Sequence, residues 1–104
     1  MNWVRAAGRD ELAGESAQRV LVGKTAVALV LSGGEYYAVD DCCTHEEARL
    51  SEGFVEDGRI ECPRHGAIFG LASGEPQSLP ATRPLKTWAV RLEGDDIMVG
   101  IPDE

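Results

Sequence analysis

Short apolar runs separated by turn signals about every ten residues make up most of the 104-residue chain. The runs at 18–22 and 24–31 are rich in β-branched residues and too short for helices, which favours strands. A Gly-Gly pair at 33–34 is typical of a hairpin turn and leads to a third predicted strand at 36–39. Because no long amphipathic period and no repeat is present, the pattern predicts an all-β fold, a small sandwich or barrel.

Two further hairpins are predicted in the second half of the chain. Asp57-Gly58 is a strong two-residue turn signal at the centre of 54–61, with short β-type segments on either side. Near the C-terminus, apolar and polar residues alternate over 88–92 and again over 97–101, with a Gly-Asp turn between the two runs. This alternation predicts a C-terminal hairpin that buries one face.

Composition and charge narrow the classes of function. Ten basic and eighteen acidic residues give a net charge of −8, which argues against binding to nucleic acid or to an anionic membrane. With 43% hydrophobic residues the chain is expected to fold, as one domain with one core. No apolar run approaches the roughly 20 residues of a membrane span, and no signal peptide is visible, so we expect a cytoplasmic protein. Three cysteines are poor evidence for a disulfide framework and favour metal binding or catalysis.

Two Cys–His pairs carry the candidate chemistry, "CTH" at 43–45 and "CPRH" at 62–65. With Cys43 as a ligand, the spacing is C-x-H, sixteen residues, then C-x2-H. The hairpin predicted between the pairs would bring two thiolates and two imidazoles together, a donor set that suits zinc or an iron–sulfur cluster. Zinc fingers normally take two cysteines from one loop and two histidines from the other. One cysteine and one histidine from each loop favours a two-metal cluster instead.

The two pairs resemble the ligand boxes of the Rieske proteins, whose 2Fe–2S centre has two His in place of two Cys on one iron. The resemblance continues in "LSEG" (50–53), "IECP" (60–63) and "SGE" (73–75), and it is close to the ferredoxin components of bacterial aromatic-ring-hydroxylating dioxygenase systems. It implies that Cys43 and Cys62 bind one iron and that His45 and His65 bind the other. Cys42 falls outside the box, where a small apolar packing role is favoured over a ligand role.

The resemblance also implies an architecture. A single Rieske domain would span 1–104, with a small β-sandwich or barrel base formed by 1–41 and 70–104. A cluster-binding subdomain, 42–69, would be inserted into that base. Pro80 and Pro84 lie in a segment that resembles the proline loop by which the family covers its cluster; a plain turn is the alternative.

Four positions distinguish this chain from the high-potential Rieske proteins of respiratory and photosynthetic chains. Where that group has a second pair of cysteines, forming a disulfide, this chain has Ala48 and Arg64. Where that group has a Ser and a Tyr that donate hydrogen bonds to sulfur, this chain has Ala67 and Phe69, which carry no donor. Fewer donors stabilise an added electron less, so the resemblance implies a low-potential cluster.

A cluster whose four protein ligands leave no open position is a carrier of single electrons rather than an enzyme. The resemblance implies transfer from a flavoprotein ferredoxin reductase to a terminal aromatic-ring dioxygenase, with transient docking of both partners near His45 and His65. The alternatives are a Rieske-like small subunit of an assimilatory nitrite reductase and, less favoured, a zinc-stabilised binding module. Acidic residues outnumber basic ones around the boxes, which fits either a docking surface or a solvated face.

Overall fold

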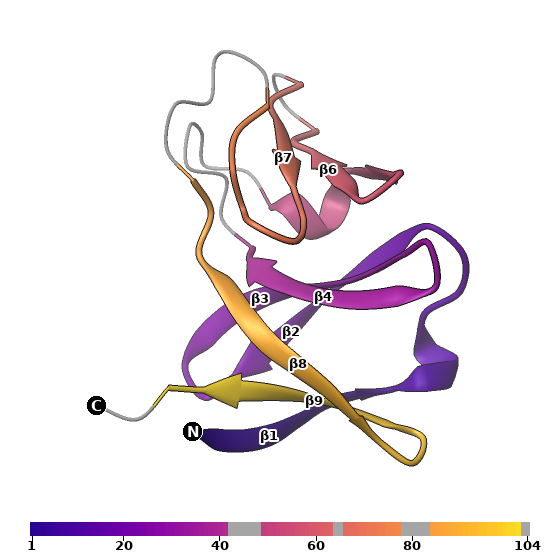
Figure 1. Ribbon diagram of the computed structural model, residues 1–104, viewed down its shortest axis with the longest axis vertical. Coiled ribbons are helices and arrows are strands. Elements are labelled where there is room, and N and C mark those ends of the chain that lie inside the picture. The colour runs from indigo at the N-terminus through magenta and orange to yellow at the C-terminus, as the bar shows by residue number, and fades with distance from the viewer. Residues whose placement is uncertain (42–48, 64–65, 78–83, 103–104) are drawn as a thin grey trace.

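The computed structural model describes residues 1–41, 49–63, 66–77 and 84–102. Their strands form two antiparallel sheets. The larger sheet has the strand order β1-β9-β8-β4-β3-β2, and the smaller has the order β5-β6-β7 (Figure 1). The larger sheet consists of β1 (Asn2–Gly8), β2 (Ser16–Val22), β3 (Thr25–Ser32), β4 (Glu35–Asp40), β8 (Thr87–Glu93) and β9 (Asp96–Ile101). The smaller consists of β5 (Phe54–Glu56), β6 (Arg59–Glu61) and β7 (Ile68–Gly70), and two 3-10 turns, η1 (Arg9–Glu11) and η2 (Leu50–Glu52), complete the described elements.

Glycines in the left-handed region make the tight hairpins. Gly33 and Gly34, with φ of 59° and 82°, turn β3 into β4, as the sequence predicts. Asp57 and Gly58, with φ of 49° and 74°, turn β5 into β6. Positive φ at both central residues gives the strand twist that two-residue hairpins require. The predicted hairpins are therefore confirmed at both sites.

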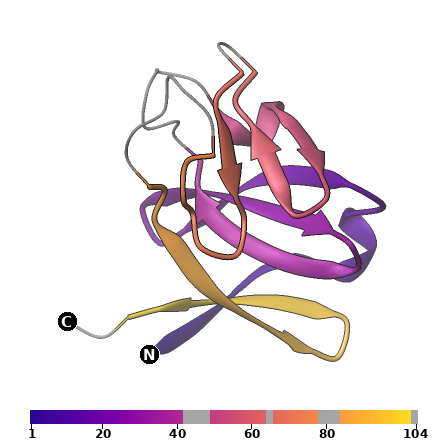
Figure 2. The same ribbon diagram turned by 45° about the horizontal axis from the view of Figure 1, so that its top comes forward.

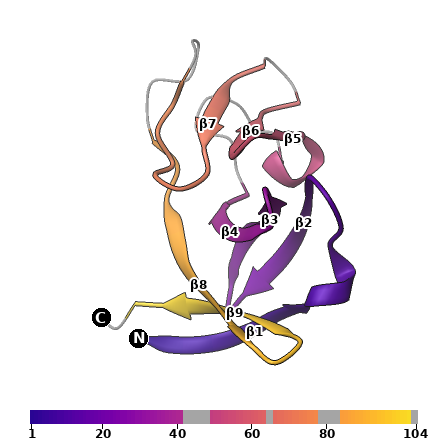
Figure 3. The same ribbon diagram turned by 45° about the vertical axis from the view of Figure 1, so that its right-hand side comes forward.

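The larger sheet curls because β8 pairs with β4 over a short stretch only. The register joins Ala38 to Trp88 and Val39 to Thr87, after which β8 leaves β4 and pairs with β9 from Ala89 to Glu93. Figure 3 shows β8 crossing from the level of β4 to the level of β9 and β1. The predicted all-β fold is confirmed, and its larger sheet forms a half-barrel.

Strand β3 is buried on both faces, and it divides the interior into two cores. Val27 and Leu29 contribute to the core inside the curled sheet, while Ala28 and Val30 contribute to the core beneath the smaller sheet. Two-sided burial explains why this stretch of the sequence is a continuous apolar run rather than an alternating one. Strands β3 and β4 thus form a middle layer, with the three short strands lying over it (Figure 2).

The structure corrects the sequence-based element assignment in three places. Strand β1 was not predicted, because its first residues are partly exposed and the apolar alternation is weak. Strand β7 was not predicted either, so the hairpin expected at 54–61 is one part of a three-stranded sheet. The buried face of the C-terminal hairpin does not extend to Leu92, which is 44% exposed. That end of β8 has already left β4, so β4 does not cover it.

Among the residues that the structure describes, no helix is long and apolar enough to cross a membrane.

Candidate metal centre

The described part of the second Cys–His box starts where β6 ends. Cys62 is 1% exposed, and its amide donates to the carbonyl of Ala67 over 2.7 Å. The amide of Gly66 donates back to the carbonyl of Cys62 over 3.1 Å. Gly66 has a φ of 71°, which a residue with a side chain adopts only at a cost. These bonds bring Gly66 and Ala67 back to Cys62, which lies in the interior; His65 lies outside the described residues.

The first Cys–His box, with Cys43 and His45, lies outside the described residues, as does Cys42. Its flanks are described and lie close together. The amide of Leu50 donates to the carbonyl of Asp41 over 2.7 Å, so the chain after the box returns to the residue before it. Asp41 itself follows β4 in the middle layer, where its amide donates to the carbonyl of Ala26 over 3.1 Å.

The flanks of the two boxes also contact each other. Leu50 and Cys62 belong to the same hydrophobic core, which lies between the middle layer and the smaller sheet. Gly53 ends the η2 turn, and a Cβ at this position would collide with the carbonyl oxygen of Glu61, the residue before Cys62. Only glycine allows that approach, which gives a physical reason for the glycine of "LSEG".

A second glycine fixes the flanks of the segment that contains Pro80. The amide of Gln77 donates to the carbonyl of Ile68, and the amide of Leu85 donates to the carbonyl of Gly74, each over 2.7 Å. Gly74 has a φ of 76°, and a Cβ there would collide with the carbonyl oxygen of Leu85. Residues 78–83, with Pro80, lie outside the described residues, whereas Pro84 is described and exposed.

The surroundings of Cys62 fit a thiolate that binds iron. The same hydrophobic core includes Ala67 and Phe69, which are both fully buried and both without a hydroxyl group. A buried thiolate is costly unless a cation or metal compensates it. Within the described ranges no group of three or more His, Cys, Asp or Glu side chains is placed to hold a metal, since three of the four predicted ligands lie outside those ranges.

Acidic side chains predominate on the η2 turn and the smaller sheet. Glu52, Glu56 and Asp57 are exposed and Glu61 is half-buried, against the exposed Arg49 and Arg59. On the outer face of the smaller sheet, a shallow hollow of about 130 Å³ is lined by residues of all three strands. They are Phe54, Glu56, Arg59, Glu61 and Ile68. Glu46, Glu47 and Arg64, which complete the predicted charge pattern, lie outside the described residues.

The fold and the two boxes are those of a Rieske protein, and the chain belongs to that family: the model of the Rieske 2Fe-2S domain matches residues 2–89. Its cofactor is therefore a Rieske-type 2Fe–2S cluster, as the sequence predicts. The 3-phenylpropionate/cinnamic acid dioxygenase ferredoxin subunit of Escherichia coli (strain K12) is 47% identical over 78 residues, which are 74% of each chain.

Two solved structures separate the predicted alternatives. A ferredoxin-sized chain in a complex of reduced oxygenase and oxidized ferredoxin in carbazole 1,9a-dioxygenase matches with a TM-score of 0.87 and 35% identity, over 93% of this chain and 91% of that chain. A putative nitrite reductase small subunit matches with a TM-score of 0.84 and 26% identity, over 97% and 100%. The higher identities lie with dioxygenase ferredoxins, which confirms the prediction of a dioxygenase-type ferredoxin that carries electrons and is not itself an enzyme.

Proposed function

We propose that Cys43 and Cys62 bind one iron of the 2Fe–2S cluster and that His45 and His65 bind the other. The observation that carries this assignment is that the described residues next to the two Cys–His boxes lie close together. Leu50 returns to Asp41 on one side of the first box, and Gly53 contacts the backbone just before Cys62. Backbone bonds to Gly66 and Ala67 hold Cys62 in the buried interior, where a thiolate needs a metal to compensate its charge.

Metal content and colour test the assignment of the ligands. Cys62→Ala and Cys43→Ala should each give protein without the cluster, whereas Cys42→Ala should retain two irons and two sulfides per chain. Cys42→Ala is the matched control because it removes the adjacent thiol. If Cys42→Ala lost the cluster and Cys43→Ala kept it, the register of the first box would be wrong. A colourless parent protein with one zinc would instead favour the binding module.

We propose that the cluster-binding subdomain spans 42–69, that the base comprises 1–41 and 70–104, and that both form one domain. When bound, the cluster supplies one-electron redox chemistry. The base would hold the described flanks of the boxes, because the middle layer is covered by a core on each face. An electron carrier benefits from such rigidity, since little rearrangement accompanies each transfer.

We propose that the redox partners are a flavoprotein reductase and a terminal aromatic-ring dioxygenase, and that they dock transiently near His45 and His65. Support comes from the similarity to a ferredoxin that is known in complex with its oxygenase. The exposed carboxylates of Glu52, Glu56 and Asp57 would steer partners with basic surfaces. Phe54, 66% exposed on the same sheet, would add apolar contact area. Electron-transfer complexes typically have small interfaces of this mixed character.

Reconstitution tests the partners. The reduced protein should transfer electrons to a dioxygenase when a ferredoxin reductase and NADH are supplied, with product formed in proportion to ferredoxin. Reduction by the reductase should slow as salt rises, because screening weakens steering. Glu46→Gln with Glu47→Gln should lower this rate and flatten its salt dependence without changing the cluster's spectrum. Electron transfer to a sirohaem nitrite reductase, and to no dioxygenase, would favour the alternative subunit.

A low reduction potential is proposed from the residues around Cys62. The structure shows that Ala67 and Phe69 are fully buried in the same hydrophobic core as Cys62. Neither position therefore offers a side-chain hydroxyl to the metal centre. We expect a potential of about −150 mV rather than about +300 mV. Ala67→Ser should raise it, as voltammetry would show. A clearly positive potential in the parent protein at neutral pH would refute the argument.

A further inference from the structure

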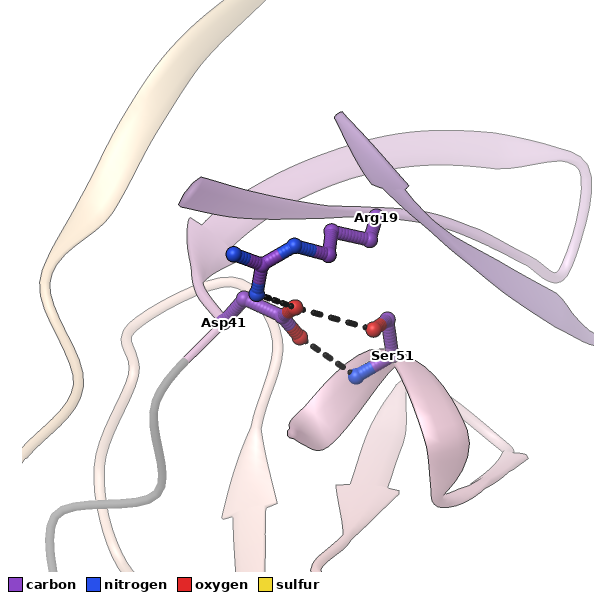
Figure 4. A network of polar contacts seen from close by, with 3 residues as sticks. All are labelled: Arg19, Asp41 and Ser51. Atoms are coloured by element: carbon purple, nitrogen blue, oxygen red, sulfur yellow. Dashed lines mark hydrogen bonds and ion pairs between the residues drawn. The ribbon is translucent and has the colours of Figure 1, made fainter. Parts of the chain in front are cut away.

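Asp41 carries a buried negative charge that the proposed function leaves unexplained. Its side chain is fully buried, and its carboxylate accepts three hydrogen bonds from residues that the structure describes (Figure 4). Oδ2 accepts from Nη1 of Arg19 at 3.0 Å and from Oγ of Ser51 at 2.9 Å. Oδ1 accepts from the amide of Ser51 at 2.6 Å. Among the described residues, Ser32 is the only other polar residue that is buried to this degree.

The three donors come from two different layers. Arg19 extends from β2 of the larger sheet, whereas Ser51 belongs to the η2 turn beneath the smaller sheet. The backbone of Asp41 makes a similar connection, because its amide bonds to Ala26 of β3 and its carbonyl accepts from Leu50. One residue therefore ties together β2, β3 and η2.

The position of Asp41 in the chain makes this tie relevant to the metal centre. Asp41 immediately precedes the segment 42–48, which contains the first Cys–His box, and Leu50 and Ser51 follow that segment closely. The same carboxylate and carbonyl thus hold the chain before the box and the chain after it. Two residues of extended chain span at most about 7 Å, so the Asp41 backbone lies within that distance of Cys43.

A buried ion pair is weak evidence for a purely stabilising role. Taking a carboxylate out of water costs several kcal/mol, and well-packed apolar residues often stabilise a core as well or better. Here the compensation is asymmetric. Asp41 is fully buried, whereas the Arg19 side chain is 39% exposed and therefore partly screened by water. The positive charge of Arg19 therefore compensates the Asp41 carboxylate only in part.

We propose that Asp41 is a positioning residue of the Rieske centre with a second, electrostatic effect. It holds both flanks of the first ligand box, and with Arg19 it forms a fixed charge pair that contributes to the reduction potential. The inference rests on the proposed function, because it places Cys43 and His45 at the cluster. Its positioning effect should appear in how firmly the cluster is held, and its electrostatic effect should appear in the potential.

Substitution of Asp41 and substitution of Arg19 should shift the reduction potential in opposite directions. Asp41→Asn removes a negative charge near the centre, so adding an electron becomes easier and the potential should rise. Arg19→Gln removes the compensating positive charge and leaves the carboxylate, so the potential should fall. A role that is merely structural would loosen the site in both variants and would give no reason for opposite signs.

The exposed pair of Arg5 and Asp96 provides the control. Nε of Arg5 lies 2.8 Å from Oδ1 of Asp96, and the pair joins β1 to β9 on the side of the larger sheet away from η2. Arg5→Gln and Asp96→Asn make the same two charge changes there. Potentials of the cluster-containing parent and the four variants would be measured by voltammetry at one pH. The shifts at Asp41 and Arg19 should exceed those of the controls.

Cluster retention tests the positioning effect. Loss of the visible spectrum in excess chelator should be at least tenfold faster in Asp41→Asn than in Asp96→Asn. Ser51→Ala, which loses the Oγ donor and keeps the amide, should fall between them with a nearly unchanged potential. If Asp41→Asn fails to fold, Arg19→Gln still tests the sign of the electrostatic effect.

The proposal is overturned if Asp41→Asn and Arg19→Gln shift the potential in the same direction. It is also overturned if their shifts do not exceed those of Asp96→Asn and Arg5→Gln. These results differ from a failure of the proposed function, which would show itself in the parent protein as the absence of a histidine-ligated 2Fe–2S spectrum.

Discussion

The two sheets obtain their stability in different ways. The curled six-stranded sheet encloses a core built from its own strands and the loop after η1. Its buried members are Ala7, Leu12, Val20, Val22, Val27, Leu29, Ala38, Ile97 and Val99. The smaller sheet has strands of three residues, and its buried members from those strands are Ile60, Phe69 and Gly70. The rest of that core comes from the middle layer and from loops, including Leu50, Cys62, Leu71 and Leu85.

A sheet of this size needs outside support. Three short strands are stable only when their apolar face packs against another layer, and here β3 and β4 supply that layer. Polar ties supplement the packing, with Asp41 holding the η2 turn and the Ser32 hydroxyl accepting from the Gly58 amide at 2.8 Å. Metal binding commonly couples to folding in small metal-binding elements. The region that carries the chemistry is thus the one that depends on its surroundings.

Removal of the cluster should therefore affect the two sheets unequally. In protein stripped of iron by a chelator, we expect the amides of β5, β6 and β7 to exchange with solvent by local opening, whereas the paired amides of β2, β3 and β9 stay protected. Hydrogen exchange of the two forms, followed by mass spectrometry, measures the difference. Equal loss of protection in both sheets would show that the protein unfolds as one unit without the cluster.

Two glycines with positive φ provide a smaller but sharper comparison. Gly94 turns β8 into β9 with a φ of 61°, and a Cβ there would meet no atom within 4 Å. Gly94→Ala should cost about 1 kcal/mol, the strain of a left-handed backbone. Gly74 has a similar φ but lies against the backbone of Leu85, so Gly74→Ala adds a steric collision and should cost about 3 kcal/mol in total. Thermal unfolding of both variants tests this difference, and equal costs would mean that the Leu85 segment moves aside freely.

The same contrast explains which parts of the fold could be predicted from the sequence. The hairpins at 33–34 and 57–58 depend on local turn chemistry, which short sequences encode directly. Strand β7 has three residues and follows a tight turn, so its pairing with β6 depends on a long-range contact rather than on periodicity. Strand β1 lies at an edge with a partly exposed face, so its alternation is weak.

The candidate site divides in a similar way. The Cys–His boxes could be found because the spacing of the ligands is itself the signal. Asp41 could not, because a single Asp before a box has no distinctive spacing, and its importance arises from burial beside Arg19 and Ser51. Gly53 and Gly74 lie in stretches that resemble the family, yet the reason for glycine is a backbone contact made only in the folded chain.

Two valines of one strand test the two cores against each other. Val27 and Val30 are both fully buried on β3, but Val27 contributes to the core of the curled sheet and Val30 to the core beneath the smaller sheet. Replacement of either by Ala should cost about 2 kcal/mol, from lost burial and an unfilled space. Only Val30→Ala should also accelerate cluster loss to a chelator. If both variants lost the cluster equally fast, the two cores would not behave as separate supports.

The smallest expected effect concerns two carboxylates. Glu15 contacts the turn of the smaller sheet, and Glu11 contacts strands of the larger sheet. Glu15 accepts from the hydroxyl of Ser32 at 2.5 Å and from the amide of Gly33 at 2.7 Å. These bonds, with a further one from the Asp57 amide, hold the pKa of Glu15 below its usual value. Glu11 lies within the larger sheet's region, where bonds from the Gly8 amide and the Gln18 side chain likewise lower its pKa.

A lowered pKa means that the ionised carboxylate favours the folded state. That contribution is present above the usual pKa of about 4.5 and is lost as the pH falls through the lower folded value. Glu15→Gln and Glu11→Gln should therefore each be less stable than the parent at neutral pH, and each difference should shrink in acid. Hydrogen exchange should locate the two effects in different places. Glu15→Gln should loosen the turn at Asp57 and Gly58, and Glu11→Gln should loosen the chain at Gly8. If Glu15→Gln left that turn unchanged at every pH, the tie between the sheets would rest on Ser32 alone, since its hydroxyl accepts from Gly58 without help from the carboxylate.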